Sequence, residues 1–522
     1  MRPAAKWMKW RKSDLIDLEK IPHIDEISHH GVFSGTHPKK TATFQERCRN
    51  RNKVMPSLEE AIRKTGLRDG MTISFHHHFR NGDHILNMVL DQLAAMGFRN
   101  LTLAASSLAA VHSPLIGHIR SGLITHIETS GLRGALAEEI SRGLMDFPVV
   151  FRSHGGRAAA VSSGDLHIDV AFLGAPSCDP YGNANGYSRD GEDGIACGSL
   201  GYARTDAEYA DQVVVITNHL VPYPNAPWAI PEHDVDYVVV TDDIGDSKGI
   251  MSGATRYTKD PKELLIAKTA ANVIEAAGYL YDGFSMQMGS GGASLATARF
   301  LRQKMLDRHM RCRFALGGIT GQIAAMYEEG LIDRILDVQS FDLDAAKSLK
   351  ENHFHHQISA TYYASHLAAA AVDQLDFVIL SALEIDTDFN VNVLTGSDGV
   401  IRGAIGGHPD TAQGASLSVI VAPLTRGRIP TVVNHVGTVV TPGDTVDVLV
   451  TDQGIAVNPR RPDVREKLQA AGLHVFSIEA LQQKAQRLVG IPEPLRYKDK
   501  IVGVVMYREN TILDVIRQID EE

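Results

Sequence analysis

The sequence has little cysteine and no long apolar run. Its four cysteines, Cys48, Cys178, Cys197 and Cys312, form no Cys-x-x-Cys pair, so neither a disulfide framework nor a zinc site is expected. No stretch approaches the ~18 consecutive apolar residues that a membrane-spanning helix needs. The basic residues 1–20 lack the apolar segment of a secretory signal peptide. These absences predict a cytoplasmic protein that has no membrane partner and binds no metal.

Basic residues and several catalytic signatures are also scarce. The chain has 52 Lys and Arg against 62 Asp and Glu, a net charge of −10, which argues against nucleic acid as the main partner. An anionic substrate would therefore need a local basic pocket. The sequence contains no Gly-x-Ser-x-Gly elbow, no His-Glu-x-x-His and no P-loop lysine, which disfavours serine hydrolases, zinc proteases and P-loop nucleotide hydrolases.

What the sequence does contain is an alternation of short apolar runs with helical segments. Residues 71–75 and 101–105 are typical of buried strands, and residues 85–96 form an amphipathic helical pattern between them. This alternation predicts a mostly parallel sheet covered on both faces, an α/β fold. Residues 1–55 are polar and weakly periodic and are interpreted as an N-terminal extension.

An internal repeat divides the remaining chain. Residues 169–185 and 376–392 both contain an Asp, an apolar strand, an Ala, a second Asp and Asn-x-Asn. Two further pairs of segments match in the same order, 122–127 with 330–335 and 69–74 with 282–287. Three matches at an offset of roughly 210 residues indicate a duplicated domain and not a solenoid. The repeated asparagines are interpreted as turn residues of the ancestral domain.

The duplication predicts two related domains, at residues 56–255 and 256–522. Lys259-Asp260-Pro261 lies near the boundary, and Pro261 suits the first turn of a helix over 262–277. Clefts between domains are preferred ligand sites, so the substrate is expected between the two copies.

The first candidate loop follows the strand at 71–75 and contains three adjacent histidines. We expect an anion-binding cluster formed by His76, His77, Arg80 and Asn81, with Arg80 as the permanent cation. Metal ligation and a plain packing or surface role are the alternatives, since at most two of three consecutive histidines in an extended chain can face one ligand.

The second domain has glycine-rich loops at the corresponding places. Backbone amides in a strand-to-helix turn can bind an anion, and amides at a strand end can stabilise a developing oxyanion. Each loop could instead be a tight turn with no ligand, and glycine can equally reflect close approach of neighbouring backbone. The candidate residues are Gly289, Ser290, Gly291, Gly292, Gly318, Thr320, Gly321, Gln322, Gly406, Gly407 and His408.

Taken together, these loops resemble those of citrate lyase alpha subunits, which belong to the CoA-transferase superfamily. The likeness runs from about residue 50 to the C-terminus and is carried by five segments: Ser74–Asp83, Ser163–Asp169, Asp179–Gly186, Ala196–Tyr202 and Gly289–Ala293. It implies two tandem CoA-transferase-like (NagB/RpiA-like) α/β domains with mostly parallel sheets, preceded by the N-terminal extension.

The resemblance also implies a reaction and partners. Acetyl on an acyl-carrier thiol would be exchanged for citryl, with citrate consumed and acetate released. The partners would be a beta subunit that cleaves the citryl thioester and a gamma subunit, the acyl carrier protein. No cofactor would be bound permanently, because the carrier's phosphopantetheine-type group, or CoA in vitro, holds the acyl group. A homo-oligomer is expected.

One departure from the wider superfamily bears on the mechanism. Many CoA-transferases have a nucleophilic Glu in the second domain, where this chain has Thr320-Gly321. We therefore expect citrate to attack the thioester directly, giving a mixed anhydride, with oxyanion donors from Thr320, Gly321 and Gln322. Glu384 is the best replacement nucleophile if the route is covalent. Citrate is expected on His76, His77, Arg80 and Asn81, and the thioester arm along Gly289–Gly292, Gly318 and Gly406–His408.

Three alternatives remain open at the level of sequence. The chain could be an ordinary CoA-transferase or acyl-CoA hydrolase that uses a Glu nucleophile. It could act on citramalate, which differs from citrate by one polar arm. It could also be a metabolite-binding regulator that binds without turnover.

Overall fold

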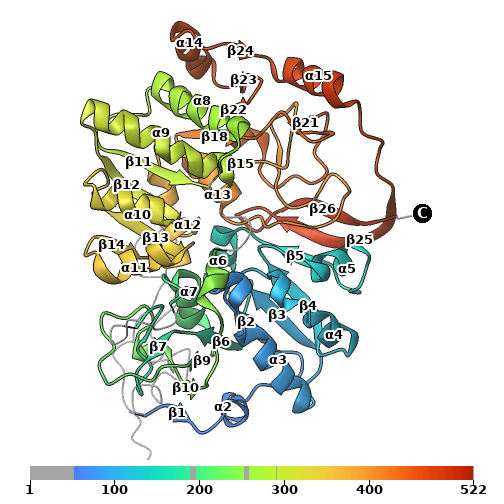
Figure 1. Ribbon diagram of the computed structural model, residues 1–522. Helices are drawn as coiled ribbons and strands as arrows, with labels where there is room; N and C mark the ends of the chain where they lie inside the picture. The colour runs from blue at the N-terminus through green and yellow to red at the C-terminus, as the bar shows by residue number, and fades with distance from the viewer. Residues whose placement is uncertain (1–51, 189–195, 252–257, 290, 521–522) are drawn as a thin grey trace, which may run out of the picture.

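A computed structural model describes residues 52–188, 196–251, 258–289 and 291–520. The chain forms two α/β halves, the first drawn mainly blue to green and the second mainly green to red in Figure 1. Each half is built on one large sheet with helices packed against it.

The first sheet has ten strands in the order β1-β10-β9-β6-β2-β3-β4-β5-β25-β26. All neighbours are parallel except β25 and β26. Its strands are β1 (Val54–Met55), β2 (Thr72–Phe75), β3 (Leu101–Ala105), β4 (Ile124–Thr129), β5 (Val149–Phe151), β6 (Val170–Gly174), β9 (Gln212–Thr217), β10 (Tyr237–Val240), β25 (Tyr497–Met506) and β26 (Ile512–Ile519). Its helices are α2 (Leu58–Thr65), α3 (Ile85–Ala95), α4 (Leu115–Arg120), α5 (Ala135–Ser141), α6 (His154–Ser163) and α7 (Gly201–Tyr209).

The second sheet has nine strands in the order β14-β13-β12-β11-β15-β18-β22-β23-β24. Its strands are β11 (Phe284–Met288), β12 (Cys312–Ile319), β13 (Ile335–Ser340), β14 (His355–Gln357), β15 (Phe377–Ser381), β18 (Leu417–Val421), β22 (Val448–Thr451), β23 (Gly454–Val457) and β24 (Val475–Phe476). Its helices are α8 (Pro261–Ala277), α9 (Gly292–Arg308), α10 (Gly321–Glu328), α11 (Leu343–Glu351), α12 (Ala360–Ala364), α13 (His408–Gly414), α14 (Pro462–Ala470) and α15 (Ile478–Val489).

Short hairpins and 3-10 turns follow the long strands. The short strands are β7 (Ser177–Cys178), β8 (Ala184–Asn185), β16 (Glu384–Asp386), β17 (Val391–Asn392), β19 (Thr425–Arg426), β20 (Ile429–Pro430) and β21 (Val432–Val433). The 3-10 turns are η4 (Arg80–Gly82), η5 (Ala110–His112), η6 (Glu232–Asp234), η7 (Ser247–Ile250), η8 (Ala371–Gln374) and η9 (Gly443–Thr445).

The two sheets repeat one topology, as the sequence repeat predicted. The order β10-β9-β6-β2-β3-β4-β5 has its counterpart in β22-β18-β15-β11-β12-β13-β14. Repeated residues make the same contacts: the Asp169 carboxylate accepts from the Thr72 N–H at 2.8 Å, and the Asp376 carboxylate accepts from the Ser285 N–H at 2.8 Å. Each bond ties the start of one strand to the start of its neighbour, which explains why these aspartates are shared by both copies.

The repeated Asp and Asn residues after the strands are also structural. Asp179 accepts from its own loop amides and from the Asn183 side chain at 2.8 Å. Asp386 accepts from the Asn390 N–H at 2.9 Å and from its side chain at 3.2 Å. These are Asx-type turns, so the asparagines shape the turn, as expected.

Two terminal segments pair with strands outside their predicted domains. β1, at the end of the expected extension, pairs with β10, and β25 pairs in parallel with β5. The C-terminal hairpin β25–β26 (red in Figure 1) thus extends the sheet of the first half. Residues 256–522, expected as one second domain, therefore also complete the first sheet. The sequence of a strand does not indicate which sheet the strand joins, because strand pairing is decided by residues distant in the chain.

Local signals explain the helix that opens the second half. Asp260 is its N-cap and accepts from the Lys262 N–H at 2.9 Å, Pro261 lies in the first turn, and Gly278 ends the helix with φ 89°. The expected helix at 262–277 is confirmed. Within the described residues, none of the helices is long and apolar enough to cross a membrane.

A separate apolar cluster joins the two halves. It combines Ala158 of α6 and Tyr202 of α7 with residues of β12, β13 and α12, including Phe314, Val338 and Tyr363. The shared buried surface fixes the orientation of the two sheets, whose strand ends then face each other.

Candidate functional site

A cavity of about 780 Å³ lies between the two halves. Its walls come from residues at or after the ends of β2, β3, β4 and β5 in the first half and of β11, β12, β13, β15 and β18 in the second. Carboxyl ends of parallel strands are where open α/β sheets bind ligands. The volume suits a small acid together with part of a longer substrate.

Four arginines line the cavity, and two of them, Arg80 and Arg133, come from the first half and lie near each other. The Arg80 guanidinium lies over the Phe341 ring, 4.8 Å from its centroid, and donates to the Ile250 carbonyl at 3.2 Å. Arg80 also has a left-handed backbone, φ 52°, which is uncommon for a residue with a Cβ. Burial and the nearby Arg133 lower the pKa of Arg80 to about 10, and burial lowers the pKa of Arg133. Two partly desolvated cations in one cavity favour an anion between them.

A stack of aromatic side chains forms the adjoining wall. His77 lies against Tyr202 with ring centroids 5.0 Å apart, and His154 lies against the same tyrosine at 4.5 Å. The His77 Nδ1 is 2.5 Å from the Ser106 Oγ. Burial lowers the pKa of His77 well below its usual value and that of His154 to about 3, with nearby arginines and histidines adding to it. The cavity wall therefore presents neutral imidazoles beside charged guanidinium groups.

Acidification is expected to destabilise the protein through the buried histidines. The pKa of His76 is lowered by burial to about 3, against about 6.5 in the unfolded chain. Between these values only the unfolded chain takes up the proton, so the free energy of unfolding falls as the pH drops below about 6.5. The expected loss is about 1.4 kcal/mol per such histidine at pH 5.5. Urea unfolding at pH 7.5 and 5.5 measures it. Between these two pH values, the free energy of unfolding of His76→Gln should fall by about 1.4 kcal/mol less than that of the parent. A substitution of the exposed His353 should leave the fall the same as in the parent.

Two buried polar atoms of the cavity-lining residues have no partner among the described residues. They are the His154 Nδ1 and the Gln287 Oε1. The Gln287 amide is held in place because its Nε2 donates to the Tyr363 hydroxyl at 2.8 Å. Buried polar groups almost always have partners, so these two atoms are available to hydrogen-bond a molecule or water in the cavity.

Glycines line the side of the cavity that belongs to the second half. Gly289, Gly291, Gly292, Gly406 and Gly407 all border it. A Cβ added at Gly291 would lie 2.1 Å from the Ser381 Oγ, and a Cβ added at Gly407 would lie 2.4 Å from the Tyr363 hydroxyl, so neither position has room for a side chain. Gly292 begins α9, a helix of 17 residues, and the first amides of a helix have no helical partner. Backbone donors can thus approach a ligand closely here. Ser290 lies outside the described residues.

Gly318 borders the cavity for a different reason. A Cβ at this position would lie 2.0 Å from the Phe341 ring, the same ring that supports Arg80. The glycine therefore allows Phe341 to lie across the strand end and hold the arginine.

The histidine loop enters the site only in part. His77 and Arg80 line the cavity. His76 is buried against His78, 3.7 Å between ring centroids, and does not line it. Asn81 is exposed, and its side-chain oxygen accepts from the Val111 N–H at 3.2 Å. The short turn η4 rotates Asn81 away from Arg80, so the two cannot face one ligand.

The residues expected as oxyanion donors lie beside the cavity but not on it. Gly321 donates its N–H to both oxygens of Asp342, at 2.9 and 2.8 Å. Thr320 is fully buried, and neither it nor Gln322 lines the cavity. The chain leaves β12 at Ile319 and enters α10 at Gly321, and this turn carries the three residues away from the cavity. Their predicted catalytic role finds no support in their position.

Glu384 and His408 are held by structural bonds. The Glu384 carboxylate accepts from the Asn392 side chain at 2.9 Å and from the Gly437 N–H at 3.0 Å, and it does not line the cavity. His408 does line it, but its ring nitrogens bond the Thr441 hydroxyl at 2.6 Å and the Ser381 carbonyl at 3.0 Å. Burial lowers the pKa of His408 to about 4. It is therefore a neutral residue that fixes the start of α13.

Sequence reasoning missed Arg133, His154 and Tyr202. The first two follow the ends of β4 and β5, just as Arg80 follows β2. The strand-end rule that selected Arg80 would have selected them too if it had been applied to every strand. Tyr202 had no such signal, because it reaches the cavity from within a helix.

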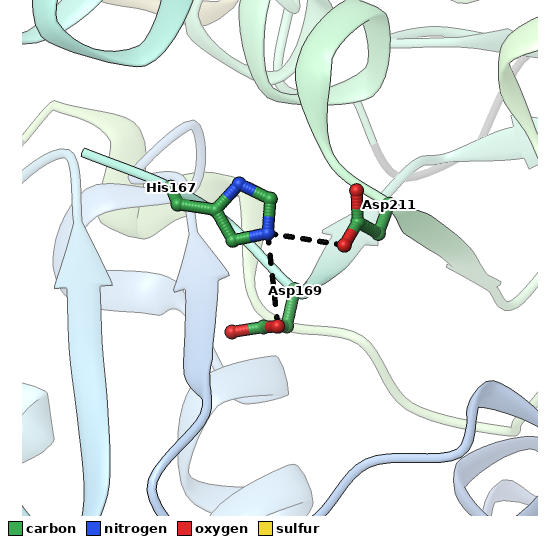
Figure 2. A group of neighbouring side chains, drawn as sticks. All are labelled: His167, Asp169 and Asp211. Atoms are coloured by element: carbon green, nitrogen blue, oxygen red, sulfur yellow. Dashed lines mark hydrogen bonds and ion pairs between the residues drawn. The ribbon is translucent and has the colours of Figure 1, made fainter. Parts of the chain in front are cut away.

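A second cluster of ionisable side chains lies at the amino ends of two strands of the first sheet, opposite to the ends that face the cavity. His167, Asp169 and Asp211 have ligand atoms within 4.8 Å of one another, and His167 bonds Asp211 at 3.0 Å (Figure 2). These residues precede β6 and β9, whereas the cavity lies beyond the strand ends. Asp169 already accepts from the Thr72 N–H. The group is therefore an exposed hydrogen-bonded cluster that also ties together the starts of neighbouring strands.

Fold and site together define the class: an α/β protein with a CoA-transferase-like fold and a basic pocket between its duplicated halves. Solved structures with the same fold include a malonate decarboxylase hetero-tetramer from Pseudomonas (16% identity, TM-score 0.63, covering 88% of this chain and 94% of that one). A 4-hydroxybutyrate CoA-transferase from Porphyromonas gingivalis also shares it (17%, TM-score 0.51, 85% and 100%).

Closer relatives identify the family. Residues 51–519 match the family model described as citrate lyase, alpha subunit (CitF). The citrate lyase alpha chains of Escherichia coli K12 and Haemophilus influenzae Rd are 58% and 54% identical, covering 93% and 97% of this chain and 94% and 99% of theirs. A solved Streptococcus mutans structure, described as a citrate lyase alpha subunit with citrate, is 53% identical with a TM-score of 0.87, covering 95% and 96%. The chain belongs to the citrate lyase alpha subunit family and is an acyl transferase component of that multi-subunit enzyme.

Proposed function

We propose that the cavity binds citrate and transfers its acyl group onto the thiol of an acyl carrier, in exchange for acetyl. The observation that carries this proposal is the pairing of Arg80 and Arg133 with the unpartnered His154 Nδ1 in one cavity. Citrate is a multiply charged anion with a hydroxyl group, and it needs both cations and neutral donors. The related Streptococcus mutans protein was solved in complex with citrate, which supports the same ligand here.

The proposed chemistry needs no nucleophile from the protein. A citrate carboxylate oxygen attacks the acetyl carbonyl carbon of the thioester, and the carrier thiolate leaves, giving an acetyl–citryl mixed anhydride. The thiolate then attacks the citryl carbonyl carbon, and acetate leaves. The first amides of α9, at Gly292 and Ala293, are placed to stabilise the oxyanions. The protein supplies proximity and charge stabilisation.

A covalent route would need a carboxylate on the cavity wall, and Glu384 is not there. Among the described lining residues the carboxylates are Asp260 and Glu263, at the start of α8.

Direct transfer predicts that Glu263→Gln keeps activity within about threefold, because no bond forms to the Glu263 carboxylate. Hydroxylamine or borohydride trapping with acetyl-CoA should label no glutamate. Labelling of Glu263, together with an inactive Glu263→Gln variant, would establish the covalent route instead. Glu384→Gln serves as the matched control, with lower stability but unchanged chemistry.

The partners follow from this chemistry. We propose that a phosphopantetheine-type arm of a gamma subunit, the acyl carrier protein, enters along the glycine-lined wall. A beta subunit would cleave the citryl thioester. CoA would replace the carrier in vitro. A cytoplasmic location and a homo-oligomeric state are part of the same proposal; the free cysteines Cys178, Cys197 and Cys312 are consistent with a reducing compartment.

The central test measures acetate release from acetyl-CoA as a function of citrate. Turnover that depends on citrate supports the proposal, whereas tight citrate binding without acetate release would favour the regulator. Citramalate in place of citrate tests specificity. A buried site that hydrogen-bonds the missing arm should discriminate by a large factor.

A further inference from the structure

Asp410 is a buried carboxylate of α13 that the proposed chemistry does not use. It is fully buried and comes from the second half, yet its two hydrogen bonds reach the first half. Its Oδ1 accepts from the Ser153 hydroxyl at 2.8 Å, and its Oδ2 accepts from the Gly155 N–H at 2.9 Å. These two donors flank His154, which lines the cavity.

The contact completes the N-terminal cap of α6. Ser153 is the N-cap of that helix and accepts from the Gly156 N–H at 3.0 Å while it donates to Asp410. A carboxylate at this end of a helix also interacts favourably with its dipole. The first turn of α6 is thus held partly by its own serine and partly by a residue of the other half.

Close packing leaves the first turn of α6 little freedom to move. A Cβ on Gly155 would lie 2.1 Å from the Ala364 carbonyl oxygen and 2.7 Å from the Asp410 carboxylate. The His154 N–H donates to the Gly406 carbonyl at 2.9 Å, a third bond across the junction. Arg508, from the turn after β25, lies 3.9 Å from Asp410 and is also buried. Burial raises the pKa of Asp410 to about 6, and the carboxylate is still ionised at neutral pH.

We propose that Asp410 is a positioning residue that sets the His154 ring in the cavity across the junction of the two halves. It acts on citrate binding through His154 and does not touch the substrate. This inference rests on the proposed transferase function. It makes the citrate site dependent on the docking of the second half, whereas Gly289, Gly291 and Gly292 of the wall for the thioester belong to a different segment, between β11 and the start of α9.

The test uses the full chain with acetyl-CoA and citrate as substrates. Asp410→Asn can accept only one of the two hydrogen bonds, so we expect the KM for citrate to rise about tenfold. The KM for acetyl-CoA should stay within about twofold. In a His154→Ala background the Asp410→Asn change should have no further effect on the citrate KM, because the residue through which it acts is gone.

Asp447→Asn is the matched control. Asp447 likewise accepts from one backbone N–H, that of Ser418 at 2.8 Å, and pairs with an arginine, Arg461 at 2.9 Å. It precedes β22, at the edge of the sheet away from the cavity. It should lower stability without changing the citrate KM. If Asp410→Asn fails to fold, Ser153→Ala is a second, milder variant, for which we expect the KM for citrate to rise about threefold.

The outcomes separate cleanly. A citrate KM that is unchanged in Asp410→Asn, or that rises equally with and without His154, overturns the inference. If the parent protein releases no acetate in response to citrate, the proposed function itself fails, whatever the variants do.

Discussion

Replacing Arg133 or Arg80 with Ala is expected to raise the KM for citrate about 100-fold. A hydrogen bond to a charged group contributes about 1.5–3 kcal/mol, and about 2.8 kcal/mol corresponds to a factor of 100. Both guanidinium groups are partly desolvated in the cavity, so their attraction for a carboxylate is weakly screened. Acetate release from acetyl-CoA at varied citrate, with calorimetry of citrate binding, gives the value.

The matched control is Arg120→Ala. Arg120 is exposed and pairs with Glu139 at the end of α4, away from the cavity. Its loss should leave the citrate KM unchanged. Arg80→Lys should recover only part of the loss, because an ammonium keeps the charge but not the fork that binds a carboxylate through two bonds. Parent-like citrate kinetics in both alanine variants would place the acid elsewhere.

Asp206→Ala is expected to have the largest effect on stability, a loss of about 3–5 kcal/mol in the free energy of unfolding. Asp206 of α7 accepts two bonds from the Arg157 guanidinium of α6, at 2.6 and 2.9 Å, and a third from the Ser74 hydroxyl at 2.8 Å. Both charges are buried. Removing one leaves the other buried and unpaired. Chemical denaturation of the parent and the variant measures the difference.

Exposed ion pairs provide the contrast. Glu208→Ala removes a partner of Arg204 on the same helix, where the two form an i,i+4 pair at 3.1 Å. This change should lower the free energy of unfolding by less than about 1 kcal/mol. Because α6 and α7 also carry His154 and Tyr202, the Asp206 variant should lose citrate binding as well as stability. A loss no greater than that of Glu208→Ala would contradict a structural role for the buried pair.

Much of the fold could be predicted from the sequence. The strand at 101–105 matches β3, the helix at 262–277 is α8 within one residue, and the duplicated segments occupy equivalent strands of two sheets with one topology. Apolar runs, the proline at the first helical turn and the Asp–Asn turns are local signals. They act over a few residues and are therefore readable without coordinates.

The site could be predicted only in part. Loop position selected His77, Arg80 and most of the glycines, and the structure brings these residues to one cavity. It could not show that η4 turns Asn81 outward or that the Gly321 N–H is already bonded to Asp342. Side-chain direction after a strand end depends on turns that no periodicity reports.

By itself, therefore, the sequence determined the family, the α/β class and the duplicated architecture, because these follow from local patterning and from repeated residues. Tertiary structure alone decided that the C-terminal hairpin completes the first sheet and that Arg133, His154 and Tyr202 meet Arg80. The physical reason is that the segments carrying these residues are distant in the chain and come together only when β2, β4 and β5 join one sheet. Burial of the apolar surface between the two halves then closes the cavity against the second half.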